Sequence, residues 1–166
     1  MNIKIKKREN ILILPDIRSV QNVGAIFRTA DAVGIDKIYL IGYTPTPLDR
    51  FGKVRGDMAK SSLGAEIFVP WEYRKTLLPL LKKLKAKNFY LIAIEQDKNS
   101  IDYRKIQTRN KNVFIIGREV KGISKSILKT CDAIAEIPMR GKKESLNVSV
   151  ATGIALYSIL NPVSRK

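Results

Sequence analysis

The sequence contains no histidine and only one cysteine, Cys131. Without an imidazole, neither a Ser-His-Asp nor a Cys-His mechanism can be built, because the general base is missing. A zinc site made from cysteine and histidine is excluded by the same count. A lone cysteine cannot form an internal disulfide, so we expect a reducing, cytoplasmic setting and no metal.

Long apolar stretches are also lacking, since none approaches the roughly 18 residues that a membrane span needs. Residues 1–8 are basic but have neither the apolar region nor the cleavage site of a signal peptide. We therefore expect no association with a membrane. The 166 residues, 45% of them hydrophobic, suffice for a sizeable core without disulfides. We expect a single domain over residues 1–166.

Acidic residues are scarce relative to basic ones. The 31 Lys and Arg residues outnumber the 15 Asp and Glu residues, which gives a formal net charge of +16. Such an excess on a small domain indicates a polyanionic partner, most often a nucleic acid. An anionic membrane surface fits less well, because no basic amphipathic helix with an aromatic face is present.

Short apolar runs alternate with segments that have helical spacing. The runs predict strands at 11–14, 37–41, 67–69, 89–94, 113–116 and 133–137. The spacing predicts helices at 20–33, 72–87 and 148–160, and a long loop at 43–64. This alternation is typical of an α/β domain with a mainly parallel sheet flanked by helices. In such sheets, ligands bind outside the carboxyl ends of the strands.

Two segments near predicted strand ends contain candidate site residues. In the first, Asn22 and Arg28 flank Gly24 near a helix start. Arg28 could bind phosphate or sugar oxygens while Asn22 orients the same substrate, although an ordinary helix start with an exposed arginine explains the spacing slightly better. In the second, Gly117 and Gly122 surround a carboxylate after a buried strand. That loop can pass its backbone against a ligand, or its glycines simply relieve strain in a turn.

The third segment begins at Ile137, where a predicted strand ends, and leads into the last helix. Ser145 or Asn147 would make a good helix N-cap, which is the simpler explanation for either residue alone. With Ser149 there are three polar side chains beside an otherwise apolar helix, and packing alone does not require them. Neither the dinucleotide fingerprint nor the Walker phosphate loop occurs, which disfavours a dehydrogenase and a P-loop NTPase.

Together the three segments resemble the motifs of the SpoU (TrmH-like) family in the SPOUT superfamily of RNA methyltransferases. Residues 22–28 resemble the first motif, 114–124 the second, and 137–151 the third, in the order and separation of the family. Residues 60–66 resemble the family's segment between the first two motifs. The resemblance extends over residues 10–161.

The resemblance implies a homodimer with an α/β fold and a C-terminal trefoil knot. It also implies transfer of a methyl group from S-adenosylmethionine to a ribose 2'-hydroxyl of tRNA or rRNA. The catalytic residues that it implies are Asn22, Arg28, Glu119, Ser145 and Asn147. The cofactor-binding residues that it implies are Ile94, Glu95, Gly117, Ile137 and Leu146.

The resemblance gives Arg28 the activation of the 2'-hydroxyl. A guanidinium is almost always protonated at neutral pH, so stabilisation of the developing alkoxide is the alternative to general-base catalysis. Two other functions stay open: a non-catalytic RNA-binding or ribosome-assembly protein, and a methyltransferase that acts on a base. We expect no separate N-terminal RNA-binding domain, so basic residues of this domain would contact RNA directly. The candidates are Lys4, Lys6, Lys7, Arg8, residues 50–60, Arg140, Lys142 and Lys143.

Overall fold

The computed structural model describes residues 8–117 and 122–161. In these residues one seven-stranded sheet has the order β3-β2-β1-β6-β4-β7-β5, and every pair of neighbouring strands is parallel. The strands are β1 (Glu9–Pro15), β2 (Lys37–Ile41), β3 (Trp71–Arg74), β4 (Tyr90–Ile94), β5 (Ile101–Asp102), β6 (Lys111–Ile116) and β7 (Ala133–Glu136).

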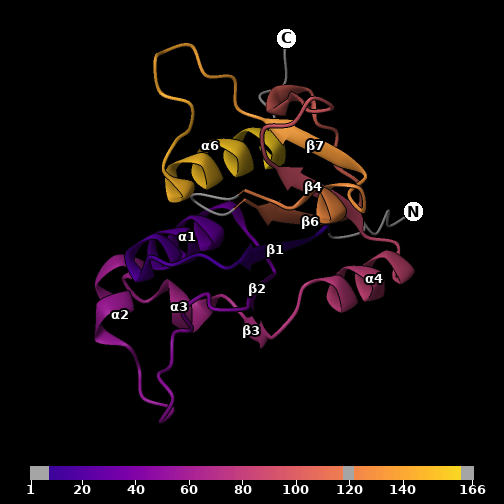
Figure 1. Ribbon diagram of the computed structural model, residues 1–166. Helices are drawn as coiled ribbons and strands as arrows, with labels where there is room; N and C mark the ends of the chain where they lie inside the picture. The colour runs from indigo at the N-terminus through magenta and orange to yellow at the C-terminus, as the bar shows by residue number, and fades with distance from the viewer. Residues whose placement is uncertain (1–7, 118–121, 162–166) are drawn as a thin grey trace, which may run out of the picture.

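Helices cover both faces of this sheet (Figure 1). They are α1 (Val20–Val33), α2 (Gly56–Ser62), α3 (Ala65–Phe68), α4 (Leu78–Ala86), α5 (Lys125–Leu128) and α6 (Val148–Leu160), with a 3-10 turn, η1 (Tyr103–Lys105). Because side chains alternate along a strand, Leu12 and Leu14 pack under α1, α2, α3 and α6. Ile11 and Ile13 face the other way and pack against α4 and α5.

The two long helices begin and end where the sequence predicts. Helix α1 starts after Ser19, whose hydroxyl accepts the backbone N–H of Asn22 at 3.2 Å. It ends at Gly34, which has a φ of 76° and donates its N–H to Ala30. Helix α6 spans the predicted residues 148–160 and is capped by Asn147. The predictions for both helices are confirmed.

Three predictions about other elements were wrong. The run 67–69 is not a strand, since α3 covers most of it and β3 follows, because a three-residue apolar run carries no distinct period. The helix predicted over 72–87 begins only at Leu78, with Pro79 in its first turn, where the missing N–H of proline breaks no hydrogen bond. The loop predicted over 43–64 contains α2.

The strand order places β6, β4 and β7 side by side, although long segments of chain separate them (Figure 1). Since these strands are parallel, their carboxyl ends meet at one edge of the sheet. The predicted fold class, a mainly parallel sheet flanked by helices, is confirmed. The trefoil knot stays a prediction, because the path of the chain includes residues 118–121, which lie outside the described residues. In the described part of the chain, no helix is long and apolar enough to cross a membrane.

Candidate functional site

A cavity of about 320 Å³ lies at the carboxyl ends of β4, β6 and β7. Its walls are apolar where strands end: Ile94 closes β4, Ile116 closes β6, and Ala135 belongs to β7. Helix α6 contributes Val148 and Ala151 to the same lining. An apolar hollow with a few polar groups at the end of a parallel sheet is the usual form of a small-molecule site.

The structure brings together all five residues that the resemblance gives to the cofactor. They line the same cavity although they come from four separate stretches of the chain: Ile94, Glu95, Gly117, Ile137 and Leu146. Ser145, expected among the catalytic residues, lines the cavity as well. Leu146 is 37% exposed although it is a large apolar residue, so it is available to a bound molecule.

Glu95 holds two backbone segments together at the cavity. Its Oε2 accepts the backbone N–H of Ile123 at 2.8 Å, and its Oε1 accepts the N–H of Gln96 at 2.9 Å. The carboxylate lies against two glycines, where a Cβ on Gly122 would stand 2.6 Å from Oε2 and one on Gly117 would overlap the same oxygen. Gly122 also has a φ of 59°, which favours glycine. The lack of side chains at Gly117 and Gly122 therefore leaves room for the Glu95 carboxylate.

A second contact at the cavity is made by Gln96, the residue that follows Glu95. The side-chain Nε2 of Gln96 donates a hydrogen bond of 2.8 Å to the backbone carbonyl of Glu144. The cavity is also lined by Gln96, Glu144 and Met139, which were not among the predicted site residues. The position of Gln96, two residues beyond the end of β4, was the only signal that could have found it. The loop before α6 is thus tied to the end of β4.

The first and third sequence segments meet at the starts of two helices. The Nδ2 of Asn147 donates to the Oδ1 of Asn22 at 3.2 Å, across 125 positions of sequence. The Oδ1 of Asn147 accepts the backbone N–H of Ser149 at 2.9 Å and its hydroxyl at 2.7 Å. Asn147, one of the two residues that the sequence offered as a cap, therefore serves as the N-cap of α6 and also contacts Asn22, and a catalytic role for it stays a prediction.

Arg28 stands apart from this arrangement. It is exposed on α1 and does not line the cavity of its own chain. Six residues of helix place it about 9 Å along the axis from Asn22. Glu119, the remaining expected catalytic residue, lies outside the described residues. Within one chain, Ser145 thus lines the cavity and Asn147 is hydrogen-bonded to Asn22, whereas Arg28 does not line the cavity.

The other candidate chemistry lies elsewhere or is missing from the described residues. Burial raises the pKa of the Cys131 thiol to about 11, and this cysteine packs near α4 and α5. Among residues 8–117 and 122–161, no three His, Cys, Asp or Glu side chains are placed to hold a metal ion. Of the expected RNA contacts, Lys4, Lys6 and Lys7 lie outside the described residues. Arg8, Arg140, Lys142 and Lys143 are exposed.

Comparison with known proteins gives one consistent family. One relative is a Staphylococcus saprophyticus protein whose name assigns it provisionally to the TrmH family of tRNA/rRNA methyltransferases. It is 32% identical over a stretch that covers 92% of this chain and 59% of the relative. The 23S rRNA (guanosine-2'-O-)-methyltransferase RlmB of Pseudomonas aeruginosa is 30% identical over 90% of this chain and 58% of its own. The crystal structure of an AdoMet-bound rRNA methyltransferase from Sinorhizobium meliloti superposes with a TM-score of 0.82 and 29% identity.

That superposition covers 92% of this chain and 56% of the S. meliloti chain. The chain therefore spans less than two thirds of the length of each of these relatives. The sequence pattern of the SpoU rRNA Methylase family matches residues 9–157, which is most of the chain and includes all three segments. The chain belongs to the SpoU rRNA methylase family.

Proposed function

We propose that this protein is an RNA methyltransferase that uses S-adenosylmethionine to methylate a ribose 2'-hydroxyl of tRNA or rRNA. The observation that carries the proposal is the cavity that gathers Ile94, Glu95, Gly117, Ile137 and Leu146 in a chain of this family. Two relatives support it: one is named as a guanosine-2'-O-methyltransferase, and another has a structure with AdoMet bound.

The cavity suits this cofactor in size and chemistry. Its volume of about 320 Å³ falls at the lower end of the range for small-ligand sites. Apolar walls from Ile94, Ile137 and Leu146 suit an adenine ring, and the glycine backbone at Gly117 allows close approach. The cofactor would supply a methyl group activated by its bond to a sulfonium. The chain would supply a dry, shaped hollow next to the start of α6.

The polar residues would then have two roles: Glu95 would order the rim of the cavity, and Asn22 and Asn147 would orient the ribose. Glu95 is a positioning residue, because both of its oxygens hold backbone N–H groups at the rim of the cavity. Asn147 and Asn22 join the starts of α6 and α1, which would orient a ribose beside Ser145. Holding a hydroxyl in line with the methyl group accounts for much of the rate in reactions of this type.

Arg28 would stabilise the negative charge that develops on the 2'-oxygen. Since Arg28 does not line the cavity of its own chain, we propose that it works beside the cavity of a second copy in a homodimer. The exposed apolar side chains of α6 support such an interface. Val150, Ile154 and Tyr157 are 49%, 37% and 50% exposed, and their spacing of four and three places them on one face of the helix.

The proposal also includes a catalytic domain that works in the cytoplasm and contacts RNA through its own basic residues. The net charge of +16 supports the last point. The knot implied by the resemblance is part of the same proposal. A non-catalytic RNA-binding protein on this scaffold is the other outcome of the test below.

The decisive experiment combines calorimetry with S-adenosylmethionine and methylation of total RNA with labelled cofactor, followed by mapping of 2'-O-methyl sites. We expect cofactor binding and labelled ribose. Binding of RNA without any heat from the cofactor would favour the non-catalytic protein, and label found only on bases would indicate a base methyltransferase.

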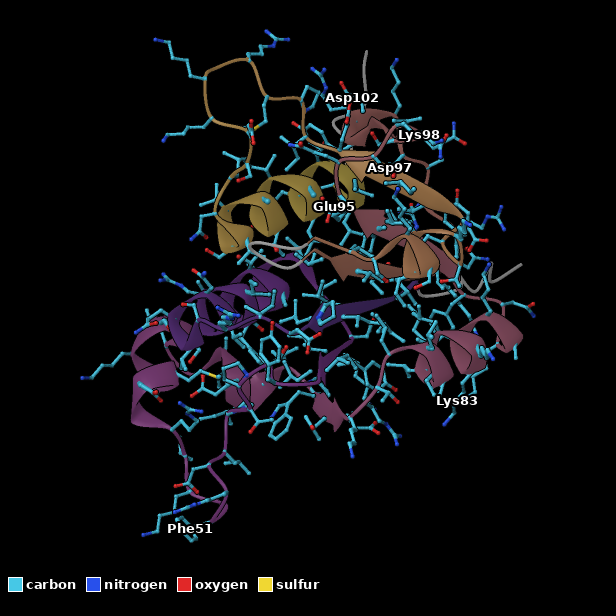
Figure 2. The ribbon with its side chains drawn as sticks, viewed as in Figure 1. Phe51, Lys83, Glu95, Asp97, Lys98 and Asp102 are labelled. Atoms are coloured by element: carbon cyan, nitrogen blue, oxygen red, sulfur yellow. The ribbon has the colours of Figure 1, made fainter. Side chains whose placement is uncertain are left out.

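A variant of Arg28 tests its assigned role in the same assay. We expect Arg28→Ala to bind the cofactor normally and to lose about 100- to 1000-fold in transfer rate, the usual effect of removing a group that stabilises an oxyanion. Lys83→Ala is the matched control, because it removes one positive charge from α4, away from α1 and α6 (Figure 2). Unchanged methylation by Arg28→Ala would refute the role.

A further inference from the structure

The chain between β2 and α2 forms a tight hairpin with a hydrogen-bonded tip. An antiparallel bridge joins Leu48 and Val54, and the backbone N–H of Asp49 donates to the carbonyl of Lys53 at 2.8 Å. The Oδ1 of Asp49 accepts the N–H groups of Phe51 at 2.8 Å and Lys53 at 2.9 Å. Three hydrogen bonds therefore fix the backbone at the tip.

This tip exposes an aromatic ring. Phe51 is 72% exposed, and Figure 2 shows it at the far end of the hairpin, away from the body of the protein. The guanidinium of Arg50 lies 4.7 Å from the centre of the Phe51 ring. A single exposed apolar ring is common on protein surfaces, but several exposed rings gathered in one place mark a surface for contact.

An open groove of about 700 Å³ lies beside the hairpin. Its lining includes two further exposed aromatic residues, Tyr43 at 53% and Tyr73 at 47%, together with Arg50 and Arg55. We call this site the stacking groove and define it by Tyr43, Phe51, Tyr73, Arg50 and Arg55. Exposed rings combined with arginines in one groove are the features that bind single-stranded nucleic acid.

The charges of the stacking groove favour an anionic ligand. Asp49 is its acidic lining residue, and the carboxylate of Asp49 already accepts two backbone N–H groups of the hairpin. Arg55 pairs with Asp57 through Nη2 at 2.8 Å, which orients its guanidinium. Over residues 49–57 the basic residues Arg50, Lys53 and Arg55 outnumber Asp49 and Asp57 by one, within a chain of net charge +16.

The stacking groove and the cavity lie along the same edge of the sheet. Tyr43 follows the carboxyl end of β2 and Tyr73 belongs to β3, whereas the cavity lies over β6, β4 and β7. Only β1 separates β2 from β6. With strands about 4.8 Å apart, the nearest strands of the two sites, β2 and β6, are roughly 10 Å apart, and β3 and β4 are roughly 19 Å apart along this edge. One strand of RNA can contact both.

We propose that the stacking groove binds an unpaired nucleotide of the RNA substrate, with its base against Tyr43, Phe51 or Tyr73 and its phosphate near Arg50. The inference rests on the proposed function in one respect, that RNA is the ligand. It adds a preference for single-stranded or looped RNA beside the methylated nucleotide, since a base in a duplex must first be unpaired and unstacked, which costs free energy.

The test measures binding of a 12-nucleotide single-stranded RNA that contains 2-aminopurine, whose fluorescence falls when the base stacks. We expect Phe51→Ala and Tyr73→Ala to weaken binding by about 5- to 100-fold and to lose much of the quenching. Phe51→Tyr keeps a ring and should bind like the wild-type protein. Phe68→Ala is the matched control, because Phe68 on α3 is 74% exposed but does not line the groove.

Two outcomes would overturn the inference. One is an RNA affinity and quenching of Phe51→Ala equal to those of the wild-type protein. The other is a change of sedimentation coefficient in Phe51→Ala with RNA binding intact, which would make the groove a protein interface. Cofactor calorimetry on the same variants separates this inference from the proposed function. Lost RNA stacking with normal cofactor binding supports the groove, whereas absence of cofactor binding in the wild-type protein contradicts the methyltransferase alone.

Discussion

The clearest test of how the cavity is built is Glu95→Gln. In the native protein both carboxylate oxygens accept backbone N–H groups, from Ile123 at 2.8 Å and Gln96 at 2.9 Å. A glutamine retains one oxygen, so one N–H must face an amide NH₂ group. Hydrogen bonds to a charged group contribute about 1.5–3 kcal/mol each. We expect a local loss of about 2 kcal/mol, which weakens cofactor binding by about 30-fold if the rim must be ordered.

An electrostatic role for Glu95 predicts a different result. If its negative charge attracted the sulfonium, Glu95→Gln would weaken S-adenosylmethionine and leave the uncharged thioether S-adenosylhomocysteine unaffected. A positioning role weakens both ligands by the same factor, because the rim of the cavity opens in either case. Calorimetry with the two ligands distinguishes these roles directly.

Glu144→Gln is the matched control for this experiment. Glu144 lines the same cavity, but its hydrogen bond with Gln96 uses its backbone carbonyl, which the substitution preserves. The same charge is removed, and we expect less than about a threefold change in either affinity, as for an exposed charge. The reasoning fails if Glu95→Gln binds both ligands as tightly as the wild-type protein, or if Glu144→Gln reproduces its effect.

Three further predictions concern stability and reactivity. Gly24→Ala places a Cβ 2.9 Å from the carbonyl oxygen of Met58, so urea unfolding should show a loss of about 1–2 kcal/mol after the helix-propensity gain of alanine; a variant as stable as the wild-type protein would contradict this close packing. Because burial raises the pKa of the Cys131 thiol to about 11, its labelling by a disulfide reagent at pH 8 should be on the order of 100-fold slower in the folded protein than in denaturant, and equal rates would refute its burial. The hydrogen bond from Lys37 lowers the pKa of Glu72, so the pair stabilises the fold above the unfolded pKa and stops doing so as the pH falls through the folded value. Glu72→Gln should therefore be less stable by up to about 1 kcal/mol at pH 6, and unfolding at a series of lower pH values should show this difference shrinking; a constant difference would exclude the ion pair as its cause.

The sequence by itself determined the local elements and the chemistry that is ruled out. The end of helix α1 could be predicted to the residue, because Gly34 adopts a left-handed conformation that stops the helix. Asn147 could be predicted as a cap because its partner, Ser149, is two residues away. The absence of histidine excluded whole mechanisms without any structure. The helix end and the cap depend only on residues a few positions away in the chain, so they can be inferred from the sequence.

The tertiary structure alone decided which distant segments meet. The contact between Asn147 and Asn22 and the hydrogen bond from Gln96 to the loop before α6 both depend on long-range pairing of strands. Local periodicity is compatible with many strand orders, and burial of the whole core selects one of them. The sequence therefore supplied the side chains of the site, and the order β3-β2-β1-β6-β4-β7-β5 placed them along one edge.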